Sequence, residues 1–202
     1  MLERQSALAE ALRAAGRTGS GDRRSLRLGE VRGWGLVQVA AFPATLSELE
    51  VSVSAALGIA GLRQRIGMAA AAGARRVLKT GPEQFWVLAP VADNLATRLQ
   101  EVVPPAMGAV TPLSHSRTRI FIEGDAAGET LARGIPLDFH PEVFVIGQFA
   151  LTGLHHTPVL VHRTGEARYE IYAMRTFALS VWEWLIDAAL PFGYDIETPA
   201  GG

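Results

Sequence analysis

Cysteine is absent from this 202-residue chain, and lysine occurs only once. The lack of cysteine excludes disulfide bonds, zinc sites built on thiolates and cysteine nucleophiles. No stretch comes near the roughly 20 consecutive apolar residues that a membrane-spanning helix needs. The N-terminal segment carries charges early and has no apolar core, unlike a secretory signal. These absences predict a cytoplasmic protein that does not insert into a membrane.

A strong charge of either sign is also missing. The 19 Lys and Arg residues are balanced by 20 Asp and Glu residues, so the net charge at pH 7 is −1. A chain without a basic surplus does not create the field that attracts nucleic acid or an anionic membrane, and we expect neither as a partner. Hydrophobic residues make up 49% of the chain, which is enough for a packed core in one domain or in two small lobes.

The common motifs of cofactor and nucleophile sites are missing as well. The sequence has no G-x-G-x-x-G, no Walker loop and no G-x-S-x-G, and Lys79 falls in a predicted hairpin. Ser114, His115 and Ser116 are neighbours on an extended segment, where side chains diverge, and capping or pairing of the next strand explains them more simply. Asp138 fits the end of a turn. We therefore predict no catalytic residue and no cofactor-binding residue on this chain.

Histidine is the remaining candidate for metal binding. His155 and His156 are adjacent, so in an extended segment they face opposite ways and do not share one ion. A site would need His156 and His162 to converge with a distant carboxylate, and no H-E-x-x-H motif supports this. We predict no metal site, and a metal-dependent hydrolase ranks third among the functions considered.

The pattern of apolar residues and turns predicts an α+β fold in which one arrangement occurs twice. The first half has the order strand, helix, hairpin, helix, strand, which is ferredoxin-like. The second half partly repeats this order. The predicted elements of the first half are 34–42, 47–60 with Ser47 as cap, 76–80, 84–89, 93–103 and 109–113. Those of the second half are 117–123, 125–133, 143–152, 158–163, 168–174 and a final helix at 176–190 with Thr176 as cap.

These elements predict two joined ferredoxin-like lobes, each with an antiparallel sheet and helices. We place the first lobe at residues 31–113. The second lobe, at residues 114–202, includes the C-terminal helix. Residues 1–30 are expected to form an N-terminal arm, with a short helix up to about residue 16 and then a polar stretch rich in Gly and Arg.

The C-terminal helix carries more apolar residues than one buried face requires. At about 100° per residue, Phe177 and Trp184 fall on one apolar face, while Trp182 and Ile186 fall on a second face centred far from the first. A helix that is apolar around most of its circumference must be covered on both sides. We therefore predict that these four residues lie in a core or an interface. Residues of the same chain or of a partner can cover the second face of the helix.

Several short segments, most of them in the second half, occur in the order seen in one known family. They are TPLSHSRTR at 111–119, GIPLD at 134–138, GQFALT at 147–152, the pair at 162–163, YEIY at 169–172, and RTFA followed by WEWL within 175–185. In these segments the chain resembles the gamma subunit of heterotetrameric sarcosine oxidase. That family is itself similar to the folate-binding T-protein, the aminomethyltransferase of the glycine cleavage system, and the resemblance implies two joined α+β lobes.

The resemblance also implies a complex with alpha, beta and delta subunits, in which sarcosine is oxidatively demethylated to glycine. Hydrogen peroxide is formed, and the one-carbon unit passes to tetrahydrofolate. FAD, FMN and NAD are implied on the alpha and beta subunits, folate on alpha and zinc on delta, so that the gamma subunit is non-catalytic and structural. Where folate-binding relatives have Gly-Tyr-Thr-Gly, this chain has HRTGEARYEIY at 162–172. The alternative is a stand-alone one-carbon transfer enzyme that binds folate between its lobes.

Overall fold

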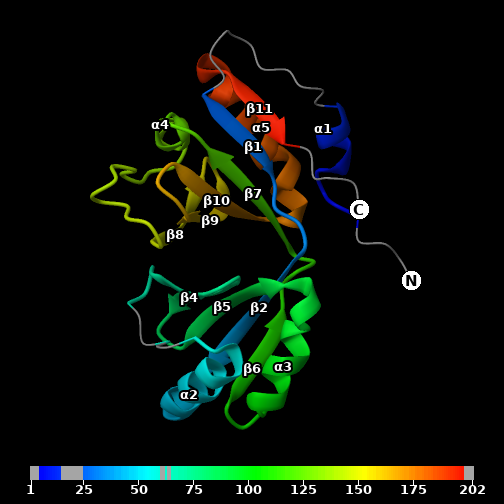
Figure 1. Ribbon diagram of the computed structural model, residues 1–202, viewed down its shortest axis with the longest axis vertical. Helices are drawn as coiled ribbons and strands as arrows, with labels where there is room; N and C mark the ends of the chain where they lie inside the picture. The colour runs from blue at the N-terminus through cyan, green and yellow to red at the C-terminus, as the bar shows by residue number, and fades with distance from the viewer. Residues whose placement is uncertain (1–4, 15–24, 60–61, 63–64, 198–202) are drawn as a thin grey trace. The chain divides into compact units, whose positions relative to one another are not determined.

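The chain divides into two compact units (Figure 1). Unit 1 contains residues 1–32 and 116–202, so it is built from both ends of the chain, and unit 2 contains residues 33–115. Each unit combines a sheet with helices, which confirms the predicted α+β class. The computed structural model describes residues 5–14, 25–59, 62 and 65–197.

Unit 2 has a ferredoxin-like topology with one added edge strand. Its elements are β2 (Trp34–Ala41), the 3-10 turn η1 (Pro43–Thr45), α2 (Leu46–Leu57), β3 (Ala69–Ala72), β4 (Arg75–Gly81), β5 (Gln84–Pro90), the turn η2 (Val91–Asp93), α3 (Leu95–Val102) and β6 (Gly108–Pro112). The sheet order is β3-β4-β5-β2-β6, and every neighbouring pair is antiparallel. Without β3, this is the β-α-β-β-α-β arrangement that the sequence predicts.

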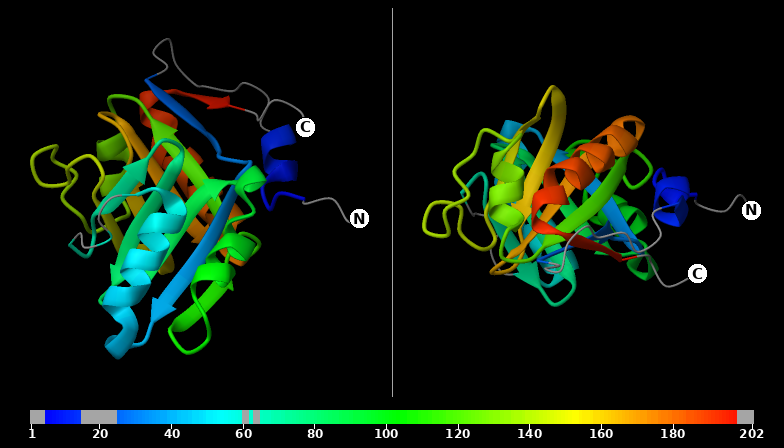
Figure 2. Two further views of the ribbon diagram at one scale, coloured as in Figure 1. Left: turned by 60° about the horizontal axis from the view of Figure 1, so that its bottom comes forward. Right: turned by 90° about the horizontal axis from the view of Figure 1, so that it is seen from above.

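Helices α2 and α3 cover one face of the unit 2 sheet (Figure 2). Leu49 of α2 and Leu99 of α3 pack in one core with Val39 of β2, and all three side chains are 0% exposed. Arg98 of α3 also donates a hydrogen bond to the carbonyl of Ala56 at 2.5 Å. This bond fixes the two helices to each other.

Helix α2 begins one residue earlier than predicted, and Ser47 is not its cap. Thr45 occupies the N-cap position without a side-chain cap bond, because its hydroxyl donates to the carbonyl of Met107 at 2.6 Å. Pro43, whose ring fixes φ, starts the 3-10 turn that leads into the helix. The helix ends where Gly58 adopts a left-handed φ of 66°.

Unit 1 repeats the topology of unit 2 with one strand inserted. Its elements are α1 (Ala9–Ala14), β1 (Leu26–Glu30), β7 (Arg117–Glu123), α4 (Ala127–Ala132), β8 (Phe149–Leu154), β9 (Thr157–Arg163), β10 (Arg168–Met174), the 3-10 turn η3 (Arg175–Phe177), α5 (Ala178–Ala189), the turn η4 (Leu190–Phe192) and β11 (Tyr194–Glu197). The sheet order is β11-β1-β7-β10-β9-β8. Strands β7, β9, β10 and β11 correspond to β2, β4, β5 and β6, while β1 lies between β11 and β7, parallel to the first and antiparallel to the second.

Strand β1 forms at the end of the segment that the sequence analysis assigns to an N-terminal arm, and it is part of the unit 1 sheet. Leu26 and Leu28 are 1% and 0% exposed and belong to the core of unit 1. Leu8, directly before α1, and Leu12 of α1 belong to the same core. The partners of β1 come from residues far along the chain, and the local composition of a five-residue strand does not reveal them. The rest of the expected arm, residues 15–24, lies outside the described residues.

The strand predicted at 143–152 forms only from Phe149 onward, as β8. Gly147 has a φ of 85°, which interrupts extended backbone. The residues before β8 instead form a loop that is attached to the end of β9. The amide of Gly147 donates to the carbonyl of Arg163 at 2.8 Å, and the amide of Arg163 donates to the carbonyl of Gln148 at 2.9 Å.

Helix α5 starts at Ala178 after a 3-10 turn, and Thr176 is not its cap. Phe177 occupies the N-cap position without a side-chain bond. The helix passes into a second 3-10 turn that contains Pro191, and Gly193, with a φ of 68°, turns the chain into β11. No helix within the described residues is long and apolar enough to span a membrane.

Candidate functional site

One face of α5 lies in the core of unit 1. Trp182 is 3% exposed and Val181 is 1% exposed. Both side chains are buried, because neighbours about 100° apart on a helix fit within one wide apolar stripe. The buried residues of the helix are Ala178, Val181, Trp182, Leu185, Ala188 and Ala189.

Trp184 lies at the edge of this face and is covered by residues of unit 1. A Cβ at Gly134, which follows α4, would overlap the Trp184 indole. The ring of His155 meets the indole edge-on, with the centroids 5.7 Å apart. The amide of His155 also donates to the carbonyl of Gly134 at 3.1 Å. Gly134 and His155 therefore pack together against Trp184. Residues of the same chain thus cover part of the second apolar face of α5.

The other two residues singled out on this helix differ in exposure. Ile186 is partly buried against the core of unit 1. Phe177 is 43% exposed, and Leu179 and Leu190 are 47% and 44% exposed. Helix α5 and its ends thus leave large apolar side chains uncovered in the described chain.

Ser114 and Ser116, on either side of His115, form hydrogen bonds with backbone groups of other segments. Ser114 Oγ accepts a hydrogen bond from the amide of Leu36 at 2.8 Å and donates to the carbonyl of the same residue at 3.2 Å. The carbonyl of Ser116 accepts from the amide of Arg175 at 2.9 Å. These contacts pair strand ends, which is the local role that the sequence analysis favours for this segment.

Four of the five histidines lie in unit 1, namely His140, His155, His156 and His162. The rings of His155 and His156 lie 6.5 Å apart. His162 is 2% exposed on β9, and its ring meets that of Phe149 edge-on at 6.3 Å. Among the residues that the structure describes, no three His, Cys, Asp or Glu side chains gather as a metal site.

The YEIY segment supplies an ion pair across neighbouring strands. Strand pairing places Tyr172 of β10 opposite Arg119 of β7. Arg119 donates to Glu170 Oε2 through Nε at 2.8 Å and through Nη2 at 2.6 Å. The Tyr172 hydroxyl donates to the same oxygen at 3.0 Å. The acid and one phenol of this segment therefore hold Arg119 in place.

Unit 1 also has an open pocket of about 860 Å³ beside α4, which we call the α4 pocket. Its walls come from the start of α4, from the loop after α4 and from the turn between β9 and β10. Sequence analysis did not find it, because three separated stretches meet there. The GIPLD segment, the pair at 162–163 and the YEIY segment each contribute one lining residue. The charged or phenolic residues that line it are Asp125, Glu129, Asp138, Arg163, Glu166 and Tyr169.

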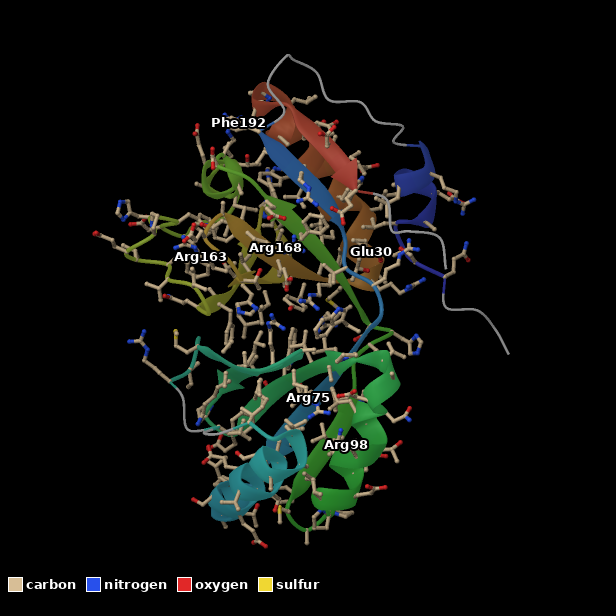
Figure 3. All side chains as sticks on the ribbon, viewed as in Figure 1. Glu30, Arg75, Arg98, Arg163, Arg168 and Phe192 are labelled. Atoms are coloured by element: carbon tan, nitrogen blue, oxygen red, sulfur yellow. The ribbon has the colours of Figure 1, made fainter. Side chains whose placement is uncertain are left out.

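Arg163, labelled in Figure 3, connects the two loops of this pocket through hydrogen bonds. The side chain is buried, at 5% exposure. Its Nη1 donates to the carbonyls of Pro141 at 3.1 Å and of Phe144 at 2.8 Å. Its Nη2 donates to the carbonyl of Glu166 at 2.6 Å, and its Nε to that of Gly165 at 3.3 Å. Backbone carbonyls, not a carboxylate, therefore satisfy this guanidinium.

Tyr169 lines the pocket opposite Arg163 in the strand register. Its ring packs edge-on against Phe139 at 5.5 Å and parallel to Phe144 at 6.4 Å, and the residue is 4% exposed. Burial raises the pKa of Tyr169, and the charge of Arg163 opposes part of that rise. The phenol is therefore neutral at physiological pH. Its hydroxyl lies beside Gly128 of α4, since a Cβ there would be 3.4 Å from the phenol oxygen.

The family model described as "Sarcosine oxidase, gamma subunit family" matches residues 40–190. The chain belongs to this family. Sarcosine oxidase subunit gamma of Arthrobacter sp is 36% identical over 142 residues, which are 70% of each chain. The gamma subunit of Corynebacterium sp. (strain U-96) is 34% identical over 142 residues, 70% of this chain and 69% of that one. The resemblance drawn from the sequence segments is confirmed.

Two solved structures have folds similar to that of this chain. A chain of the heterotetrameric sarcosine oxidase from Corynebacterium sp. U-96, in complex with pyrrole 2-carboxylate, matches with a TM-score of 0.84 and 30% identity, over 94% of this chain and 96% of that chain. Glycine cleavage system aminomethyltransferase T from Bartonella henselae matches with a TM-score of 0.68 and 17% identity, over 96% of this chain and 58% of that chain. The second match confirms the predicted aminomethyltransferase-like fold.

Proposed function

We propose that this chain assembles as the gamma subunit of a heterotetrameric sarcosine oxidase, in which it stabilises the assembly and contributes no catalytic residue. The observation that carries the proposal is the similarity to one chain of the Corynebacterium sp. U-96 heterotetramer over 96% of that chain. A subunit that matches nearly the whole of its counterpart has the fold needed to present equivalent surfaces to equivalent partners.

In the proposed assembly the partners are the alpha, beta and delta subunits. The reaction is the oxidative demethylation of sarcosine to glycine, with formation of hydrogen peroxide and transfer of the one-carbon unit to tetrahydrofolate. We assign FAD, FMN and NAD to the alpha and beta subunits, tetrahydrofolate to alpha and zinc to delta. The assembly is proposed to be cytoplasmic.

We further propose that α5 and its ends contact a partner subunit. Phe177, Leu179 and Leu190 are each more than 40% exposed, and exposed apolar side chains that gather on one element are typical of interaction sites. Trp184 and Ile186 of the same helix are only partly buried against the core. Large aromatic side chains commonly act as anchors in such interfaces.

Size-exclusion chromatography of the co-expressed operon products tests the assembly. We expect this chain to elute with a yellow flavoprotein complex, and elution of the chain apart from that complex would overturn the proposal. Phe177→Glu should lower the yield of complex while leaving the folded chain soluble. Glu101→Gln, a change at an exposed polar position of unit 2 outside the proposed contact, is the control and should leave the yield unchanged.

The stand-alone folate enzyme is not favoured, because the chain covers only 58% of the aminomethyltransferase T chain that it matches. Calorimetry of the purified chain with tetrahydrofolate separates the two functions. We expect no heat of binding and no rise in melting temperature. A saturable heat would instead support independent folate binding.

A further inference from the structure

The α4 pocket has an excess of negative charge. Asp125, Glu129, Asp138 and Glu166 line it, and Arg163 is the one guanidinium among the lining residues. None of the four carboxylates makes an ion pair with a described residue. Asp138 uses only one oxygen, which accepts the backbone amide of His140 at 2.8 Å.

Two carboxylates on strands next to the pocket are paired within the chain. Glu123, directly before the pocket-lining segment, accepts from Arg168 at 2.7 Å, and Glu170 is held by Arg119 at 2.6 Å. Arg163 lies in the pocket wall itself but directs its donors to backbone carbonyls. The fold therefore pairs these nearby acids internally and leaves those of the pocket open to a cation from outside the chain.

Tyr169 provides an independent sign of a ligand. The residue is 4% exposed, and within the described residues its hydroxyl has no hydrogen-bond partner. The ring is enclosed by Phe139 and Phe144, so the hydroxyl, beside Gly128, is the part that reaches the pocket. The hydroxyl opens onto the pocket, so it is available to accept a hydrogen bond from a bound ligand in place of water.

We propose that the α4 pocket binds an organic cation through its ammonium or guanidinium group. The N–H groups of the ligand donate to the carboxylates of the wall and to the phenol oxygen of Tyr169, while its carbon chain lies against Phe139 and Pro141. The carboxylates do not converge on one point, since no three metal-ligating side chains gather in the described chain. This dispersion fits an extended organic cation better than a compact metal ion. The inference goes beyond the assembly role and does not depend on it.

Nuclear magnetic resonance of the 15N-labelled full-length chain, titrated with 1,5-diaminopentane, tests the site. We expect saturable shifts of amide signals from residues 124–129 and 138–141. The same titration with 1,5-pentanediol, which has the same length without charge, should leave these signals in place. Shifts that do not saturate, that spread evenly over the chain, or that the diol reproduces would overturn the proposal.

Substitutions in the pocket sharpen the test. Tyr169→Phe removes one hydrogen bond to a charged group and should weaken binding of 1,5-diaminopentane about tenfold. Asp138→Asn keeps the oxygen that accepts the His140 amide and removes the charge, so it should weaken binding about three- to tenfold. Glu183→Gln on α5 changes the net charge by the same amount and should have no effect. Equal losses of affinity for 1,5-diaminopentane in Asp138→Asn and Glu183→Gln would show that the binding is non-specific charge attraction, and would overturn the proposal.

The cation can be a free amine or a Lys or Arg side chain of a neighbouring subunit, and the assembled complex distinguishes the two sources. Calorimetry compares the complex that contains the parent chain with the complex that contains Tyr169→Phe. A heat of 1,5-diaminopentane binding that depends on Tyr169 in the complex identifies a site for free amines. Loss of this heat on assembly, with binding retained in the isolated chain, identifies a partner side chain as the occupant. Absence of Tyr169-dependent binding in both forms overturns the proposal.

Discussion

Arg163 donates a hydrogen bond to the carbonyl of Phe144 at 2.8 Å, and this contact ties the end of β9 to the loop before β8. The same guanidinium reaches the carbonyl of Pro141 at 3.1 Å and that of Glu166 at 2.6 Å. One buried side chain thus fixes two loops of unit 1, and both loops border the α4 pocket. The phenyl ring of Phe144, which is 3% exposed, completes the attachment of the loop to the core.

Arg163→Met should lower the free energy of unfolding by about 2–4 kcal/mol, because several carbonyls lose their donor at a buried site. Arg163→Lys should recover only a small part of this loss, since one ammonium group does not reach carbonyls that lie on different loops. Urea denaturation followed by circular dichroism measures the effect. Arg133→Met is the control, with an expected loss below about 1 kcal/mol, because Arg133 is exposed. Equal stability of the Arg163→Met chain and the parent would contradict this account.

Local signals in the sequence were sufficient for the hairpins and for most helices. The turn at Gly81 separates β4 from β5 as predicted, and β9 and β10 pair across the predicted turn. Strands β1 and β11 were not predicted, because each is short and each forms by pairing with the other. Leu26 pairs with Tyr194, at a sequence distance over which composition and periodicity carry no information.

The surroundings of the candidate site residues could also be predicted only in part. Periodicity identified the apolar positions of α5, but it did not tell which chain covers them. The structure answers this for Trp184, because Gly134 and His155 come from connections that the helix pattern does not contain. The α4 pocket was beyond the reach of the sequence, since Asp125, Asp138 and Tyr169 meet only after the sheet has formed.

Trp182→Ala should be the most destabilising single change on α5. The side chain is 3% exposed and lies in the core of unit 1, and truncation of such a residue costs about 3–5 kcal/mol. Phe177→Ala, at a position that is 43% exposed, should cost less than about 1 kcal/mol. Thermal unfolding of both variants checks the difference. Similar melting temperatures for the two would mean that Trp182 is not a core residue.

Gly134→Ala should destabilise the chain through Trp184. The added methyl group would overlap the indole, and such overpacking costs about 1–3 kcal/mol. The cost should largely disappear in a Trp184→Ala background, because the clashing ring is then gone. A double-mutant cycle measures this coupling.

Gly128→Ala is the control for the Gly134 substitution. Its Cβ would meet Phe139 and the Tyr169 hydroxyl at 3.4 Å, a close but tolerable contact, so its effect should be small. Additive losses of stability in Gly134→Ala and Trp184→Ala would show that Trp184 does not restrict the side chain at position 134.

Tyr169 should make the stability of the chain dependent on alkaline pH. Burial raises its pKa in the folded state above the ordinary value of about 10, so the folded chain holds this proton more tightly than the unfolded chain. The resulting stabilisation is complete below about pH 10 and is lost as the pH rises through the raised pKa. The melting temperature should therefore fall as the pH rises above about 10, and Tyr169→Phe should make this fall less steep.

The fall should not disappear in Tyr169→Phe, because the pKa of Tyr194 is raised as well, by burial and by the negative charge of Asp187. Tyr169→Phe combined with Tyr194→Phe should flatten the profile further than either change alone. Melting curves of the four chains at matched ionic strength provide the measurement. A Tyr169→Phe profile parallel to that of the parent would mean that the Tyr169 phenol has the same proton affinity in the folded and unfolded chain, and its enclosure by Phe139 and Phe144 would then have no electrostatic consequence.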